Sequence, residues 1–225
     1  MSSIGARPLV IDTKASQIRQ RLSEAIINGE LRPGDRIVLD ELARELGVSK
    51  IPLREALSSL EGAGLVVTTP HAGPRVAPLP THEIRGIYLV REQLEPLAAR
   101  LAAEHANDEL IDELHDLNDR MRRRAGRASD VEMSGLNSGF HLAIARATTF
   151  QTVVESVDEL ITKIRRYRSI AEGAPADWDG AIAEHEEIIS ALADADAERA
   201  AAAMRAHVHA RRLIEPTAEA GDGHA

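Results

Sequence analysis

The chain has 225 residues, a length that suits one large domain or two modest ones. With 44% hydrophobic and 28% charged residues and no cysteine, its composition is that of a globular, cytoplasmic protein without disulfides or thiolate metal sites. It has neither the long apolar run of a membrane span nor, in residues 1–10, the apolar core of a secretory signal, so no membrane partner is expected.

The net charge of −9 is distributed unevenly along the chain. Residues 1–78 carry ten Lys or Arg against nine Asp or Glu, so the acidic excess lies in residues 79–225. This asymmetry indicates different partners for the two halves. Because the first half is nearly neutral, a nucleic-acid function for it has to rest on its motifs rather than on its charge.

The first half contains helical and strand patterns in a defined order. Apolar residues at helical spacing predict a helix across 18–26 and a short second helix across 42–46, which stops at a glycine. Ser49 is expected to cap a third helix, with a proline in its first turn. A strand across 65–69, a turn and a return strand across 75–77 follow. This is the order of a winged helix-turn-helix.

The second half is predicted to be entirely helical. Two prolines within Ala77–Thr81 favour a stiff linker ahead of it. Six helices are predicted after that linker: 82–106, 108–125, 130–148, 151–171, 178–193 and 196–214. We therefore expect a mainly α protein with two domains, a winged helix-turn-helix over 11–78 and an antiparallel helical bundle over 82–214.

The third helix is the expected recognition helix, because the second helix of a helix-turn-helix enters the major groove. Burying its leucines turns the opposite face outward, where Lys50 and Arg54 lie one turn apart and reach phosphates or guanine edges. The predicted DNA-binding residues are Ser49, Lys50, Ile51 and Arg54, with His71 and Arg75 on the wing. Small helix-turn-helix units also serve as protein-interaction modules, so the pattern alone leaves both functions open.

Residues 11–78 resemble the winged helix-turn-helix of the GntR family of transcription regulators. The matching stretches are Gly29–Gly34, Glu41–Ala43, Leu46–Leu57 and Leu60–Val66. Three positions depart from the usual pattern: Lys50 stands for Arg, Ile51 for Thr and Asp40 for Arg. Lysine lacks the bidentate fork of arginine, so the family's usual operator is not expected here. The resemblance implies a homodimeric regulator, expected to be a repressor, on a pseudo-palindromic double-stranded DNA operator.

Four residues of the second half have the spacing of a metal site. Asn137 and His141 lie one turn apart on one predicted helix, and His185 and His207 stand on two others. Three imidazoles and an amide oxygen hold a divalent ion with positions left open for water or a ligand. The chain has nine histidines, so the spacing alone equally fits solvated or hydrogen-bonded side chains.

Residues 82–214 resemble the FCD ligand-binding domain of the FadR subfamily. The matching stretches are Tyr88–Ala102, Asn137–Ala145, Glu184–Ile188 and Ala200–His207. The resemblance implies a divalent metal (Zn²⁺, Ni²⁺ or Mn²⁺) on Asn137, His141, His185 and His207, with Asn137 as the rarer choice at its position. It also implies an organic or sugar acid effector whose carboxylate meets the metal, and it places Arg91 at that pocket. Without the resemblance Arg91 reads as a surface charge, although it falls in an apolar stripe and needs a partner, either Glu95 or an acid ligand.

Two alternative functions remain beside an effector-gated regulator. One is a metal-responsive regulator without an organic effector. The other is a metal-dependent hydrolase or hydratase that carries a helix-turn-helix. No H-E-x-x-H or nucleophile motif supports the enzyme, and we expect no catalytic residue.

Overall fold

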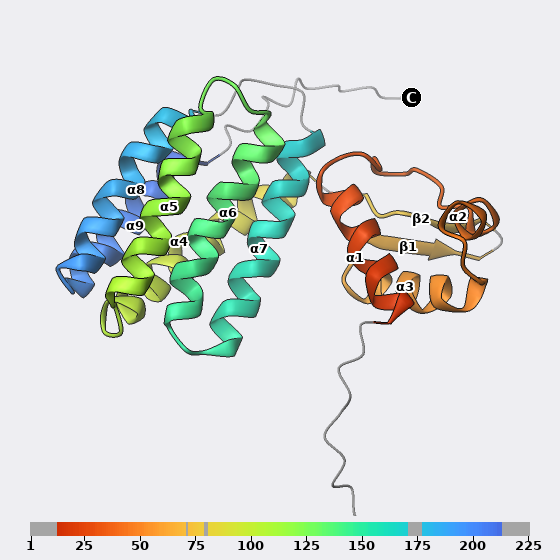
Figure 1. Ribbon diagram of the computed structural model, residues 1–225, viewed down its shortest axis with the longest axis horizontal. Helices are drawn as coiled ribbons and strands as arrows, with labels where there is room; N and C mark the ends of the chain where they lie inside the picture. The colour runs from red at the N-terminus through yellow and green to blue at the C-terminus, as the bar shows by residue number, and fades with distance from the viewer. Residues whose placement is uncertain (1–12, 71, 79–80, 171–176, 213–225) are drawn as a thin grey trace, which may run out of the picture. The chain divides into compact units, whose positions relative to one another are not determined.

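The computed structural model describes residues 13–70, 72–78, 81–170 and 177–212 (Figure 1). The chain divides into two compact units, Met1–Pro78 and Leu79–Ala225. His71, a predicted wing residue, lies outside the described residues. Each unit has its own hydrophobic core, so each is described by itself.

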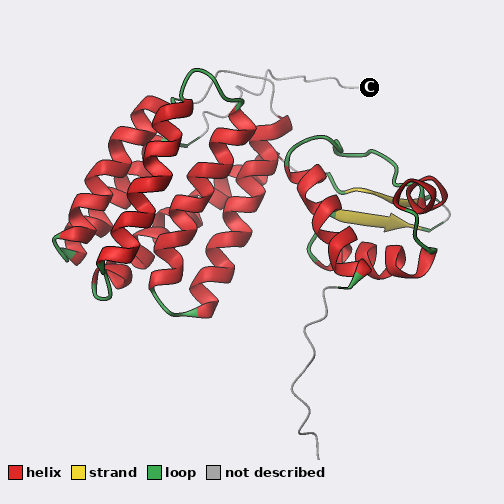
Figure 2. Ribbon diagram, viewed as in Figure 1, coloured by secondary structure: helices red, strands yellow, loops and turns green. Residues whose placement is uncertain are grey.

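The N-terminal unit is a winged helix-turn-helix, as the sequence predicts. Its elements are α1 (Lys14–Ile27), α2 (Leu39–Leu46), α3 (Lys50–Gly62), β1 (Val66–Thr69) and β2 (Gly73–Val76). The two strands pair antiparallel, with Val66 opposite Val76 and Thr69 opposite Gly73 (Figure 2). The return strand therefore starts two residues earlier than expected, because Gly73, at φ 78°, closes a tight turn directly onto Thr69.

The turn between α2 and α3 sets the direction of the recognition helix. Gly47 takes a left-handed conformation with φ 62°, which ends α2. Ser49 is the N-cap residue of α3, but the expected capping bond is absent, since its side chain accepts no hydrogen bond from the first turn of that helix. Packing therefore fixes α3, through Leu53, Ala56, Leu57 and Leu60, all buried against α1 and the strands.

The C-terminal unit is a helical bundle, as predicted. Its described helices are α4 (Thr81–Ala103), α5 (Asp108–Arg124), α6 (Asp130–Ala147), α7 (Gln151–Ile170), α8 (Trp178–Ala193) and α9 (Ala197–Ala210). α4 ends three residues before the predicted position, because Asn107 caps α5 with an extended backbone and its Oδ1 accepts from the amide of Leu110. Residues 213 and 214, predicted as the end of the last helix, lie outside the described residues.

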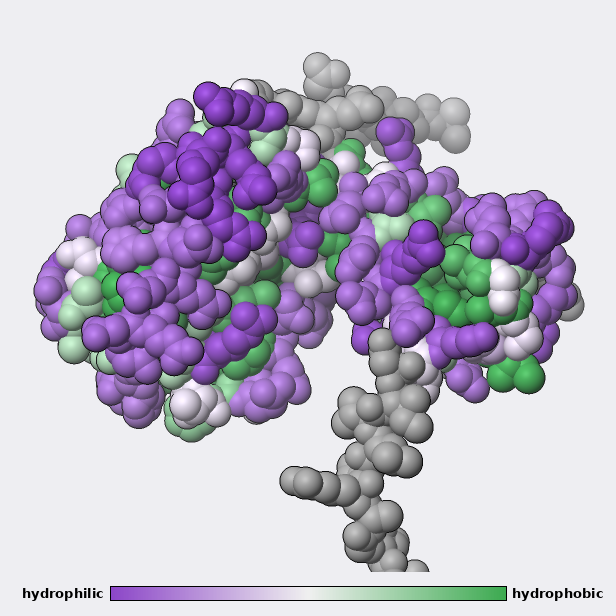
Figure 3. Space-filling model, in the orientation of Figure 1, coloured by the Kyte–Doolittle hydropathy of each residue, from purple (hydrophilic) through white to green (hydrophobic). Residues whose placement is uncertain are grey.

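Helix α4 lies at the centre of the bundle and packs against α6, α7 and α9 (Figure 1). The core contains Tyr88, Leu114, Phe140, Ile188 and Met204, all buried. The face that α5, α6 and α7 present in Figure 3 is mostly hydrophilic, as expected for amphipathic helices. Within the described part of the chain, no helix is both long and apolar enough to span a membrane.

Pro96 lies inside α4 and leaves a backbone group without its helical partner. A proline has no N–H, so the carbonyl of Glu92, four residues earlier, loses its hydrogen bond within the helix. The guanidinium of Arg205, on α9, donates to this carbonyl oxygen at 3.1 Å. The contact repairs the break in α4 and ties it to α9.

Candidate metal centre and DNA interface

Three histidines from three helices meet inside the C-terminal unit. His141 comes from α6, His185 from α8 and His207 from α9, and all are at most 2% exposed. One ring nitrogen from each lies within 4.8 Å of the others. The fourth predicted ligand, Asn137, lies one turn before His141 on α6 and is half-buried.

Each of these histidines has an oxygen behind its Nδ1 atom. Glu95 Oε2 lies 2.6 Å from His141 Nδ1, Glu184 Oε2 lies 2.8 Å from His207 Nδ1, and Asn118 Oδ1 lies 3.1 Å from His185 Nδ1. An oxygen at Nδ1 keeps the hydrogen of a neutral imidazole there and leaves the Nε2 lone pair for a metal. His185 and His207 therefore turn Nε2 toward the cluster as a possible ligand atom, and the His141 ring lies beside Glu95 with its Nε2 facing that of His207.

Among the described residues, no side-chain oxygen is recorded as a hydrogen-bond partner of any of the three Nε2 atoms. His141 Nε2 lies 3.2 Å from His207 Nε2, so two lone pairs face each other unless a proton or a cation lies between them. His185 Nε2 is buried and has no hydrogen-bond partner within the described residues. Buried polar atoms without a partner are costly, so the donor set fits a divalent metal ion with imidazole ligands.

Burial keeps two of the three rings neutral, which a metal ligand requires. Desolvation lowers the pKa of His185 well below its usual value, and the neighbouring His207 and His141 lower it further. The pKa of His207 is also lowered well below its usual value, by desolvation and then by His141. Burial alone raises the pKa of Glu95, but Arg91 and His141 outweigh it and hold that pKa well below its usual range.

Arg91 lies in the apolar stripe of α4, as predicted, and is only 4% exposed. Its Nε–H donates to Glu95, the partner one turn along the helix, and its guanidinium lies 5.3 Å from the ring centre of Tyr88. Glu95 thus contacts both Arg91 and His141, and it joins the predicted effector residue to the histidine cluster. A guanidinium has five N–H donors, so one bond to Glu95 does not exhaust it.

The sequence interpretation missed the residues behind the histidines. Asn118 falls on the buried stripe of α5, beside Leu114 and Met121, and an amide in an apolar stripe is a signal that it has polar partners. Glu184 precedes His185 in the chain, but its side chain contacts His207. Arg211 donates a hydrogen bond to Glu184 at 2.9 Å. That assignment depends on how α8 and α9 pack, which spacing does not reveal.

On the N-terminal unit, the structure exposes the predicted face of α3. Ser49, Lys50 and Arg54 are exposed at or near its N-terminus, and Ile51 is 66% exposed. Lys50 Nζ lies 2.5 Å from a carboxylate oxygen of Asp40. Two of the three residues that depart from the usual family pattern therefore pair with each other. On β2, Arg75 is exposed and donates to the carbonyl of Gly34 at 2.9 Å.

Comparison with known proteins places both units of the chain in one family. The model for bacterial regulatory proteins of the gntR family matches residues 14–76, and the model for the FCD domain matches residues 86–210. The chain belongs to the GntR family and carries an FCD domain. It is a DNA-binding transcriptional regulator and not an enzyme, which removes the hydrolase alternative.

Relatives match over most of their length. The chain is 32% identical over 194 residues to the Nta operon transcriptional regulator of Aminobacter aminovorans, a match that covers 84% of this chain and 89% of the relative. It is 28% identical over 218 residues to the probable D-xylose utilization operon transcriptional repressor of Paenarthrobacter nicotinovorans, covering 97% and 95%. The solved structure of E. coli McbR/YncC shares the fold, with a TM-score of 0.76 at 24% identity, and covers 89% of this chain and 95% of that one.

Proposed function

We propose that this regulator is a repressor whose affinity for its operator is changed by a small organic or sugar acid, bound beside a divalent metal in the FCD domain. The observation that carries the proposal is the convergence of three buried imidazoles on one point, next to the buried Arg91–Glu95 pair. His141, His185 and His207 would hold the metal, with the Asn137 amide as the fourth ligand. The candidate metals are Zn²⁺, Ni²⁺ and Mn²⁺, since imidazole suits all three.

Arg91 is the proposed contact for the carboxylate of the effector. A guanidinium suits a carboxylate through two parallel hydrogen bonds, and Arg91 is already beside the histidine cluster through Glu95. An acid could bind the guanidinium N–H groups that Glu95 leaves unused, and its charge would weaken the Arg91–Glu95 pair. The packing of α4 would then change, which offers a route for coupling the effector site to DNA binding.

The operator contacts proposed for the N-terminal unit are Lys50, Ile51 and Arg54 on α3, with Ser49 at its start and Arg75 and His71 on the wing. Exposure of the α3 residues supports this role. The Lys50–Asp40 pair is exposed and therefore weak, so it leaves Lys50 available to a phosphate. An operator of two half-sites requires two such helices related by a two-fold axis, hence a homodimer.

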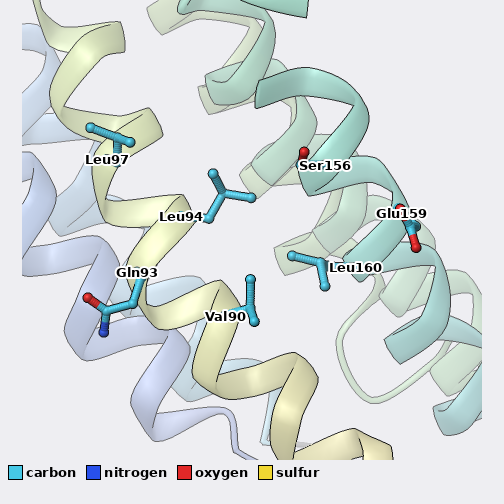
Figure 4. Close-up of a pocket in the computed structure, with 7 residues that line it drawn as sticks. All are labelled: Val90, Gln93, Leu94, Leu97, Ser156, Glu159 and Leu160. Carbon is cyan, nitrogen blue, oxygen red and sulfur yellow. The ribbon is translucent and has the colours of Figure 1, made fainter. Parts of the chain in front are cut away.

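An apolar groove between α4 and α7 is the proposed contact between the two copies. In Figure 4, Val90 and Leu94 on α4 and Leu160 on α7 point toward one another across the groove, with Ser156 and Glu159 on the α7 side. Val90 and Leu97 are 51% and 46% exposed. Neighbouring apolar side chains that are this exposed to water are typical of a contact surface for another molecule. GntR regulators typically dimerise, so we assign this face to a second copy of the chain.

The test is release of DNA from the region upstream of the regulator's own gene, followed by fluorescence anisotropy. Carboxylic acids are added with each metal and with a chelator. We expect acids to weaken DNA binding only when metal is present, and Arg91→Lys to bind DNA normally while losing the response, because lysine lacks the fork. Release by metal alone would favour a metal-responsive regulator without an organic effector.

A further inference from the structure

Asn118, on α5, is a fully buried amide that lies directly behind His185. Its Nδ2 atom lies 3.1 Å from the carbonyl oxygen of Ile182 and 2.6 Å from Glu186 Oε1. Both of these oxygens only accept hydrogen bonds, so the NH₂ end of the amide has to face them. The surroundings therefore fix which end of the Asn118 amide is oxygen, a choice that is otherwise ambiguous.

The orientation of Asn118 determines the hydrogen position on His185. Its Oδ1 faces His185 Nδ1 at 3.1 Å and can only accept, so Nδ1 carries the hydrogen and Nε2 keeps its lone pair. The ring also stacks on Phe140, with centroids 3.8 Å apart and planes 7° apart. The imidazole of His185 is thus held at its edge by Asn118 and on its face by Phe140.

The support behind His185 differs from that behind the other two histidines. His141 and His207 are backed by the carboxylates of Glu95 and Glu184, whereas His185 is backed by a neutral amide. The amide in turn depends on Glu186, whose Oε1 also accepts from Arg122 at 2.6 Å. Glu186 and Arg122 have side chains 42% and 50% exposed, so this chain of contacts reaches the surface.

We infer that Asn118 is a positioning residue for the metal ligand His185, and that Glu186 keeps its amide from turning over. The inference rests on the proposed metal site and adds an outer layer to it. If the amide turned over, its NH₂ group would face Nδ1 and favour the hydrogen on Nε2, where it blocks a metal. Residues in this outer layer typically change metal affinity by about 10–100-fold when they are removed.

The experiment measures two quantities on the full-length chain. The first is the dissociation constant for Zn²⁺, by competition with a chromophoric chelator. The second is the tautomer of His185 in metal-free protein, from long-range ¹H–¹⁵N NMR couplings. Asn118→Leu should weaken Zn²⁺ binding by about 10–100-fold and turn the single Nδ1–H form of His185 into a mixture. Asp112→Leu, an exposed position on the same helix, should change neither.

A second pair of variants tests the inference without touching the core. Glu186→Leu should lower Zn²⁺ affinity and mix the tautomers, by less than Asn118→Leu does. Glu186→Gln should keep wild-type values, because its amide oxygen still accepts from Asn118. Because the Glu186 side chain is partly exposed, both of its variants are expected to fold. They therefore test the inference even if Asn118→Leu does not fold.

The outcomes separate this inference from the proposed site. A wild-type chain that takes up no metal overturns the site, and the positioning role with it. A wild-type chain that binds Zn²⁺, with Glu186→Leu and a folded Asn118→Leu binding equally well and keeping the Nδ1–H tautomer, overturns only the role of Asn118.

Discussion

His141 and His207 direct their Nε2 atoms at each other across 3.2 Å, although they come from the separate helices α6 and α9. Each has a carboxylate oxygen beside its Nδ1, from Glu95 and Glu184, and in a neutral ring that oxygen would hold the hydrogen on Nδ1, away from the other histidine. Two ring nitrogens this close in a buried site need a proton or a metal cation between them, and this relationship is the strongest reason to expect a metal here.

Removing two of the three imidazoles should therefore abolish metal uptake. We expect His141→Ala combined with His185→Ala to reduce the metal content of the purified protein strongly, as measured by elemental mass spectrometry. His209→Ala is the matched control, because His209 lies on α9 near His207 but is exposed. Equal metal content in the double variant and the control would refute the site.

Metal-free protein should lose stability in mild acid. Folding lowers the pKa values of His185 and His207. Below about pH 6.5, the usual pKa of histidine, both rings therefore bind protons in the unfolded chain but not in the folded one. Stability conferred by the neutral rings is complete above that pH and falls as the pH drops, by about 1.4 kcal/mol per pH unit for each ring.

Urea unfolding at pH 7, 6 and 5 in the presence of a chelator measures this slope. His185→Gln should make the slope about half as steep, since the glutamine does not titrate and His207 still does. An unfolding free energy that stays constant between pH 7 and 5 would contradict the assignment of neutral buried rings.

Arg205 and Pro96 should be thermodynamically coupled. Arg205→Met removes the donor to the Glu92 carbonyl and should cost about 0.5–1.5 kcal/mol of unfolding free energy. In a Pro96→Ala background the new backbone N–H serves that carbonyl, so the same substitution should cost much less. A double-mutant cycle by urea unfolding gives the coupling, and strictly additive costs would disprove it.

The α4–α7 groove should be needed for dimer formation. Leu97→Glu places a charge in the proposed contact, and an uncompensated buried charge costs about 3–5 kcal/mol. Light scattering after size exclusion should show a monomer. Val67→Glu, at an apolar position 40% exposed on β1 of the N-terminal unit, should remain a dimer.

The fold shows where sequence reasoning succeeds, whereas the metal ligands stay a prediction. Helical spacing locates the six helices described in the C-terminal unit because each buries a continuous stripe, and the leucines of α3 do the same for the recognition helix. The cap at Ser49 fails because a suitable residue does not guarantee the bond, and packing fixes α3 without it. The contact between Asn118 and His185 joins residues 67 apart, so only the packing of α5 on α8 reveals it.

Sequence-specific DNA binding by α3 is the central claim, and a footprint on the DNA upstream of the regulator's own gene tests it most directly. We predict two protected half-sites, related by a two-fold axis and about one helical turn apart. Arg54→Ala should weaken binding by about 1–3 kcal/mol if Arg54 meets a base. Exposed Glu55→Ala, next to it on α3, is the control for loss of a charged side chain. A single unpaired footprint, or wild-type affinity after combined Lys50→Ala and Arg54→Ala substitution, would contradict the account.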